Sequence, residues 1–139
     1  MLTLLVLCWF ALIFGATVFT HAGKAITTNL VTALGGAAPK YVGWGTGAGT
    51  AAVTDTTLFT ESADETRATG TITRVTTSQT NDTVQVVGTM TCATSGKTIT
   101  NVGLFDAVSS GNLYMKSDFT GLALLVGDSI QFTLKVQYT

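Results

Sequence analysis

The sequence predicts an all-β protein: an antiparallel β-sandwich or small barrel with a short N-terminal helix and an apolar N-terminal arm. Thr supplies 28 of the 139 residues, and this β-branched, half-polar side chain suits a pleated sheet with one wet face. Apolar and polar residues alternate over residues 129–138, as in a strand with one buried face. Turn signals recur at roughly the 8–12-residue spacing of sandwiches and barrels.

The first 19 residues contain no charged side chain. As a helix they would span ~28 Å, about the thickness of a bilayer core. Three interpretations fit: a secretory signal peptide, a membrane anchor, or an arm buried against partner subunits. A signal peptide begins with basic residues, and none precedes this apolar run. For a membrane anchor, Lys24 is the only flanking charge that could set the orientation. We therefore expect an arm over 1–20, one β-rich domain over 21–139, and a protein that is not a free monomer.

Apolar residues at helical spacing predict a short helix over 21–34. Gly35 and Gly36 are expected to end this helix as its C-cap. After Pro39, residues 40–42 are expected to begin a short strand.

The sequence GWGTGA at 43–48 matches the G-x-G-x-x-G/A pattern of dinucleotide-binding loops. Such a site needs a helix directly after the glycines, and the residues that follow are poor helix formers. We interpret 43–49 as a flexible glycine loop, with Trp44 as a packing or contact residue. A long polar loop over 50–65 follows, which Leu58 and Phe59 are expected to anchor to the core.

From residue 66 onward the apolar residues follow a period of two, which predicts strands paired in antiparallel fashion with one face in a core. Segment 98–105 is one of these strands. In the others we expect these residues to face inward: Val84, Val86, Met90 and Cys92; Leu113, Met115 and Phe119; and Ile130, Phe132, Leu134, Val136 and Tyr138.

The charge balance argues against nucleic-acid binding. Lys and Arg number 7 against 8 Asp and Glu, giving a net charge of −1, so no basic footprint for phosphates exists. Two cysteines, Cys8 and Cys92, do not make a disulfide framework. With His21 as the only histidine, neither a zinc cluster nor a Ser–His or Cys–His pair can be assembled.

Four acids lie close together in the polar loop: Asp55, Glu61, Asp64 and Glu65. Paired acids serve glycosidases or hold calcium, but no calcium-loop pattern accompanies them, and we interpret them as soluble surface. We predict no enzymatic activity, no catalytic or metal-binding residue and no cofactor.

Six runs resemble a family of small tailed-bacteriophage virion structural proteins. They are AGKAITTN at 22–29, PKYVGWGTG at 39–47, TTLFTE at 56–61, NVGLFD at 101–106, GNLY at 111–114 and GDSIQF at 127–132. The resemblance extends over roughly residues 22–139, and its motifs are structural and not catalytic.

This resemblance implies a capsid decoration, or cement, protein that bridges major capsid subunits on the exterior of the virion. We expect a dimer or trimer, since closed symmetry matches the axes of a shell, with no direct contact to nucleic acid or membrane. Two alternatives stay open: a tail, baseplate or fibre component, and a membrane-anchored or exported bacterial β-domain that displays a binding surface. Apolar side chains of the arm and two aromatic residues beyond it are the expected contacts: Leu4, Leu7, Trp9, Phe10, Phe14, Phe19, Tyr41 and Trp44.

Overall fold

The all-β prediction is confirmed by a computed structural model that describes residues 14–138. In chain order the elements are β1 (Phe14–Phe19), α1 (His21–Thr32), β2 (Tyr41–Gly45), β3 (Ala68–Thr69), β4 (Thr71–Val75), β5 (Thr83–Thr91), β6 (Lys97–Phe105), β7 (Leu113–Leu124) and β8 (Ser129–Gln137). The predicted contact residues Leu4, Leu7, Trp9 and Phe10 lie outside the described residues.

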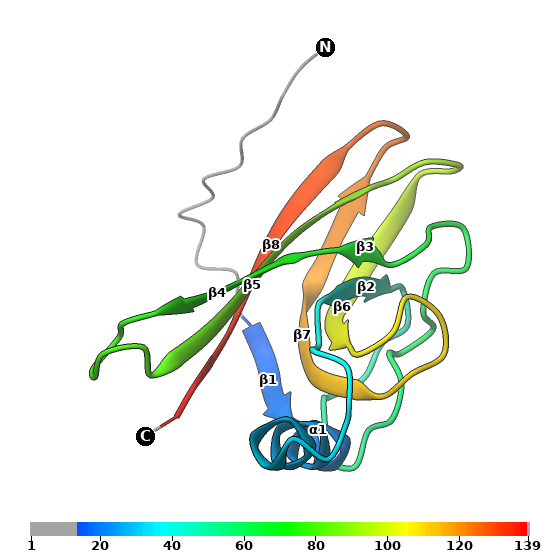
Figure 1. The fold of residues 1–139 in the computed structure, drawn as a ribbon. Helices are drawn as coiled ribbons and strands as arrows, with labels where there is room; N and C mark the ends of the chain where they lie inside the picture. Colours follow the sequence, from blue (N-terminus) through cyan, green and yellow to red (C-terminus); the bar gives the residue numbers. More distant parts are fainter. Residues whose placement is uncertain (1–13, 139) are drawn as a thin grey trace.

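The strands form two antiparallel sheets (Figure 1). The larger sheet has the order β1-β7-β6-β2-β3, and the smaller has the order β4-β5-β8. The β5–β6 and β7–β8 connections each carry the chain from one sheet to the other. Within the described residues no hydrogen-bonded ladder joins the two sheets, so the architecture is the sandwich.

The chain also changes sheet between β3 and β4, where Gly70 separates the two strands. A Cβ on Gly70 would lie 2.6 Å from a Val86 methyl group and 3.1 Å from the carbonyl oxygen of Lys40. The Gly70 amide donates to that same Lys40 carbonyl at 2.7 Å. Only glycine fits this corner, where the backbones of both sheets approach each other closely.

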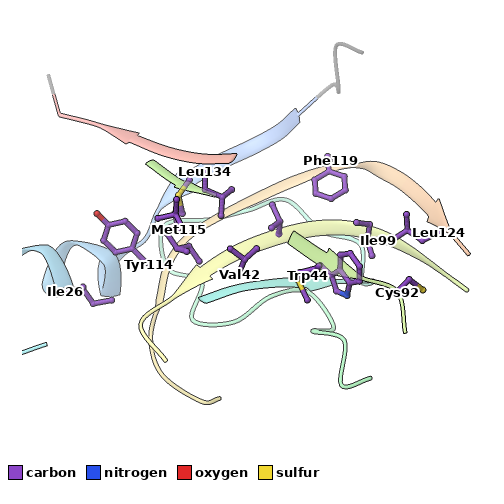
Figure 2. Packing of buried hydrophobic residues seen from close by; sticks show 14 residues of the cluster. Ile26, Val42, Trp44, Cys92, Ile99, Tyr114, Met115, Phe119, Leu124 and Leu134 are labelled. Carbon is purple, nitrogen blue, oxygen red and sulfur yellow. The ribbon is translucent and has the colours of Figure 1, made fainter. Parts of the chain in front are cut away.

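The main core lies between the two sheets (Figure 2). Val86 and Met90 of β5 and Leu134 of β8 are buried there, and partly buried side chains of β8 pack beside them. The inward faces predicted for β5 and β8 are therefore confirmed. The last predicted member, Tyr138, lies beyond β8 and is 44% exposed.

Trp44 is part of this core and is only 1% exposed. Its ring meets Phe132 edge to face, at 6.4 Å between centroids. Strand β2 extends to Gly45, so Gly43–Gly45 belong to a strand, and strand alternation turns Val42 and Trp44 inward. The prediction that Trp44 contacts a partner is corrected, because the opposite sheet covers its side chain.

The predicted helix is confirmed. Thr20 caps its start by accepting from the amide of Gly23 at 2.9 Å. Its C-cap is Ala33, in the left-handed conformation at φ 55°, and not Gly35 and Gly36 as predicted. Only Gly23 and Ile26 are buried along the helix. The remaining apolar residues of its pattern do not reach the core.

Residues 14–19, which the sequence analysis placed in the arm, form edge strand β1. Phe19 of this strand packs edge to face on Tyr114, with 4.9 Å between ring centroids. The β-domain therefore includes these residues. The prediction for β7 also changes: Leu113 through Ser117 are all buried, because both faces of this strand are covered.

Candidate docking surface

The outer face of the larger sheet is covered by residues 46–67, which we call the capping segment. Alternate glycines of β2 and the turn after it make room for this segment. A Cβ on Gly45 would lie 2.4 Å from the Phe59 carbonyl oxygen, and one on Gly49 would lie 2.6 Å from the Phe59 ring. The capping segment thus packs directly against the glycines of the dinucleotide-like motif and fills the space beside them.

A buried and a half-buried polar side chain hold the capping segment in place. The Asn101 side-chain amide donates to the carbonyl oxygens of Gly47 at 3.2 Å and Phe59 at 3.1 Å, and its oxygen accepts from the Phe59 amide at 3.1 Å. The Asp118 carboxylate accepts from the amide of Ala51 at 2.8 Å. A segment without regular structure is thereby fixed to the sheet by bonds to its backbone.

Lys116 is buried beneath the same segment, with a side chain that is 0% exposed. Its ammonium group donates to Asp55 at 2.9 Å and to the Thr57 carbonyl oxygen at 3.0 Å, and lies 3.0 Å from the centre of the Phe59 ring. Burial raises the pKa of Asp55, but hydrogen bonds from Lys116 and the Ala52 amide outweigh it, so the pKa is lowered overall. This ion pair is structural, because its groups face one another under a covering layer.

Glu65 forms a second polar cluster at the far end of the capping segment. Its carboxylate accepts from the Trp44 indole at 3.2 Å, Ser62 at 2.7 Å, the Ala93 amide at 3.2 Å and Lys97 at 2.6 Å. Burial opposes ionisation, but these four hydrogen bonds lower the pKa of Glu65 to about 2. Burial likewise opposes the charge of Lys97, and its bonds to Glu65 and Asp64 raise its pKa. A carboxylate with so many donors is a poor base, and its role is to join β2, β6 and the capping segment.

We expect acid to weaken this cluster. Because the pKa of Glu65 is lowered from 4.5 to about 2, its contribution to the free energy of unfolding is complete above pH ~4.5 and is lost as the pH falls toward ~2. In urea titrations across this range, the free energy of unfolding of Glu65→Gln should fall by about 1–2 kcal/mol less than that of the unmodified protein, a value reduced for solvent screening. An equal fall in the free energy of unfolding for the two proteins would show that Glu65 does not stabilise this cluster.

The four acids predicted as soluble surface are each paired with a cation. Asp55 binds Lys116, Asp64 and Glu65 bind Lys97, and Glu61 makes a two-point contact with Arg67 at 2.6 and 2.9 Å. The Arg67 guanidinium group also lies 3.3 Å from the centre of the Phe105 ring. No group of three or more potential metal ligands occurs among residues 14–138.

An open apolar groove of about 430 Å³ lies between α1 and the inner face of the smaller sheet. Its lining residues are Thr27, Leu30, Val31, Ala38, Pro39, Ile72, Val84, Tyr114 and Tyr138. Val31 is 81% exposed and Leu30 is 42% exposed, although both belong to the apolar pattern that predicts the helix. The pattern shows a real apolar helix face, but the sheet beneath contacts only the first turns of the helix.

The floor of the apolar groove is uncharged. The Tyr114 hydroxyl group lies 2.8 Å from that of Tyr138 and accepts from Thr27 at 3.3 Å. Burial raises the pKa of Tyr114 well above its usual range, and the neighbouring Tyr138 hydroxyl acts in the same direction. This surface is therefore suited to apolar groups and unsuited to charged ligands.

A second apolar feature lies at the β7–β8 turn, residues 125–128. Leu125 is 73% exposed and Val126 is 58% exposed, in a type of position that polar residues usually occupy. The Asp128 carboxylate accepts from the Leu125 amide at 2.8 Å, and Gly127 has a φ of 94°, so the turn is well defined. We call Leu125 and Val126 the apolar tip.

The remaining predicted contact residues lie elsewhere. Tyr41 is half-buried against the small cluster of Leu58, Phe105 and Leu113 on the outer face of the larger sheet. Phe19 is half-buried beside the main core. The backbone of Phe14 pairs with Phe119 in the β1–β7 ladder. The structure does not bring these residues together in one surface, and the sequence analysis missed the apolar groove.

Comparisons with known proteins found no similar protein. No protein-family model matches the chain, and neither a curated protein nor a solved structure does so. In the part of the chain that the structure describes, no helix combines the length and apolar character needed to cross a membrane.

Proposed function

We propose that this chain is a non-enzymatic structural protein of a tailed-bacteriophage virion, and specifically a capsid decoration protein. It would bridge and stabilise neighbouring major capsid subunits from the exterior of the particle. The observation that carries the proposal is the exposed apolar groove, with Val31 81% exposed at its rim. The resemblance of residues 22–139 to small virion proteins supports the same conclusion.

The scaffold around the apolar groove suits a docking role. None of the buried side-chain nitrogen or oxygen atoms in the described residues lacks a hydrogen-bond partner, so the polar groups of the interior are already satisfied. The surface that a partner could still bury with a favourable change in free energy is that of the exposed apolar side chains. On a lattice, modest contacts of this kind add up to high avidity.

Occupancy of capsids assembled without this protein tests the proposal. Val31→Asp should raise the concentration needed for half-occupancy at least tenfold, because a charge in an apolar contact costs more than about 1.4 kcal/mol. Val108→Asp is the matched control, since Val108 is an exposed valine outside the groove, and it should bind as the unmodified protein does. Bound copies are counted by quantitative mass spectrometry of purified particles.

Electron microscopy of labelled particles then distinguishes the alternatives. Label spread over the shell supports decoration, whereas label confined to the tail or baseplate assigns the protein there and contradicts the proposal. Absence of binding to any particle, together with partitioning of the native protein into detergent, would favour the exported β-domain. A variant that lacks residues 1–13 measures what the arm contributes, and the truncation must stop there because Phe14–Phe19 form β1.

A further inference from the structure

The apolar groove and the apolar tip lie at opposite ends of the sandwich. Figure 1 shows α1 and the chain end that follows β8 at one end, and the β7–β8 turn at the other. Both features are apolar and exposed, one concave and one a protruding turn. Because they are far apart on one molecule, they can meet only between two copies.

The charges around the two features are complementary. Beside the apolar tip, Asp128 is the last residue of the turn. Asp64 and Glu65 are paired with Lys97, whose backbone pairs with Leu124 just before the turn. Acids therefore outnumber bases at this end.

The surroundings of the apolar groove have the opposite balance. Lys24 precedes Thr27 by one turn of α1, and Arg74 lies on the same face of β4 as Ile72. The Lys40 ammonium group does not contribute, because it lies 5.6 Å from the centre of the Tyr41 ring on the outer face of the larger sheet. Asp82 lies nearby and stays negatively charged, because its partners are neutral donors: backbone amides of its own turn and the Gln137 side chain. Lys24 and Arg74 still outnumber it. An approach of tip to groove is therefore favoured by charge as well as by burial of apolar surface.

We propose that the apolar groove of one copy receives the apolar tip of a second copy of this chain. The contact joins two different surfaces, so it leaves a free groove and a free tip at the two ends of every dimer. Repetition then produces a closed ring or an open filament. This inference rests on the proposed function, for which it names the partner: neighbouring decoration copies bind one another as well as the shell.

Two variants of the full-length chain test the contact without any capsid. Val31→Asp blocks the apolar groove and Val126→Asp blocks the apolar tip. Each variant alone should weaken self-association at least tenfold. An equimolar mixture should form a heterodimer and nothing larger, because the intact tip of Val31→Asp meets the intact groove of Val126→Asp. Sedimentation velocity measures the species, and circular dichroism with thermal melting verifies that both variants are folded.

The outcomes separate this contact from others. Val108→Asp, with the same chemical change outside both features, should associate as the unmodified chain does. The inference is overturned if the unmodified chain stays monomeric at all concentrations, if either variant associates normally, as Val126→Asp would through a groove-to-groove contact, or if the mixture stays monomeric. If self-association fails in one of these ways but Val31→Asp still binds capsids more weakly than the unmodified chain, the decoration proposal stands.

Discussion

Replacing Lys116 with alanine is expected to lower the free energy of unfolding by about 3–5 kcal/mol. The side chain is fully buried, so the substitution leaves a cavity and removes the donor for Asp55 and the Thr57 carbonyl oxygen. Both acceptors belong to the capping segment and would face the sheet without their donor, and an unsatisfied acceptor costs more than the bond contributes. Urea unfolding followed by circular dichroism measures the loss.

Two companion variants give this prediction its controls. Lys116→Met keeps most of the volume and should lose less than Lys116→Ala, which separates the cavity from the missing charge. Lys135→Ala removes an exposed lysine of β8 and should stay within about 0.5 kcal/mol of the unmodified protein. If Lys116→Ala is as mild as Lys135→Ala, Lys116 does not anchor the capping segment.

Replacing Gly45 with alanine is expected to cost about 2–3 kcal/mol, although it adds only one methyl group. The new Cβ would lie 2.4 Å from the Phe59 carbonyl oxygen and 2.7 Å from both side-chain amide atoms of Asn101. The first is backbone and the second is held by several bonds, so neither can move aside without releasing the capping segment. Thermal melting and amide hydrogen exchange measure the effect, with exchange accelerated in residues 46–61.

Gly43→Ala serves as the matched control for Gly45→Ala. Gly43 lies two residues earlier on the same face of β2, and its new Cβ would meet a Glu61 oxygen at 3.0 Å and an Arg67 side-chain carbon at 3.2 Å. Those atoms belong to side chains that can adjust, so we expect about 1 kcal/mol or less. Equal losses for the two variants would show that strand propensity, and not the capping segment, determines the cost.

The sequence was sufficient to predict the elements whose residues alternate or repeat clearly. Strands β5 and β8 have one apolar and one polar face, so their inward residues follow from a period of two. The helix was likewise predictable from its apolar spacing. Edge strand β1 was not, because FGATVF lies in a continuous apolar run with no alternation to distinguish a strand from an arm.

The candidate surfaces were harder to predict, because they depend on which face a distant segment covers. Lys116 alternates with the residues of β7 that were predicted to face inward, yet it is buried as well, because the capping segment covers the other face of the strand. Val31 belongs to the apolar pattern that predicts the helix, yet it is 81% exposed, because no other element among residues 14–138 covers it. Pattern shows which side chains share a face, but tertiary packing decides whether that face is inside.

The capping segment also has a consequence for protein engineering. Irregular stretches are normally the first choice for peptide display or loop grafting, because length changes there are usually harmless. Here such a stretch packs on alternate glycines, and Phe59 lies against three of them, Gly45, Gly47 and Gly49. Lengthening or shortening residues 46–61 by a single residue would shift every following backbone group off its partner. Libraries built on this scaffold should therefore keep that stretch at constant length and vary it only at outward-facing side chains.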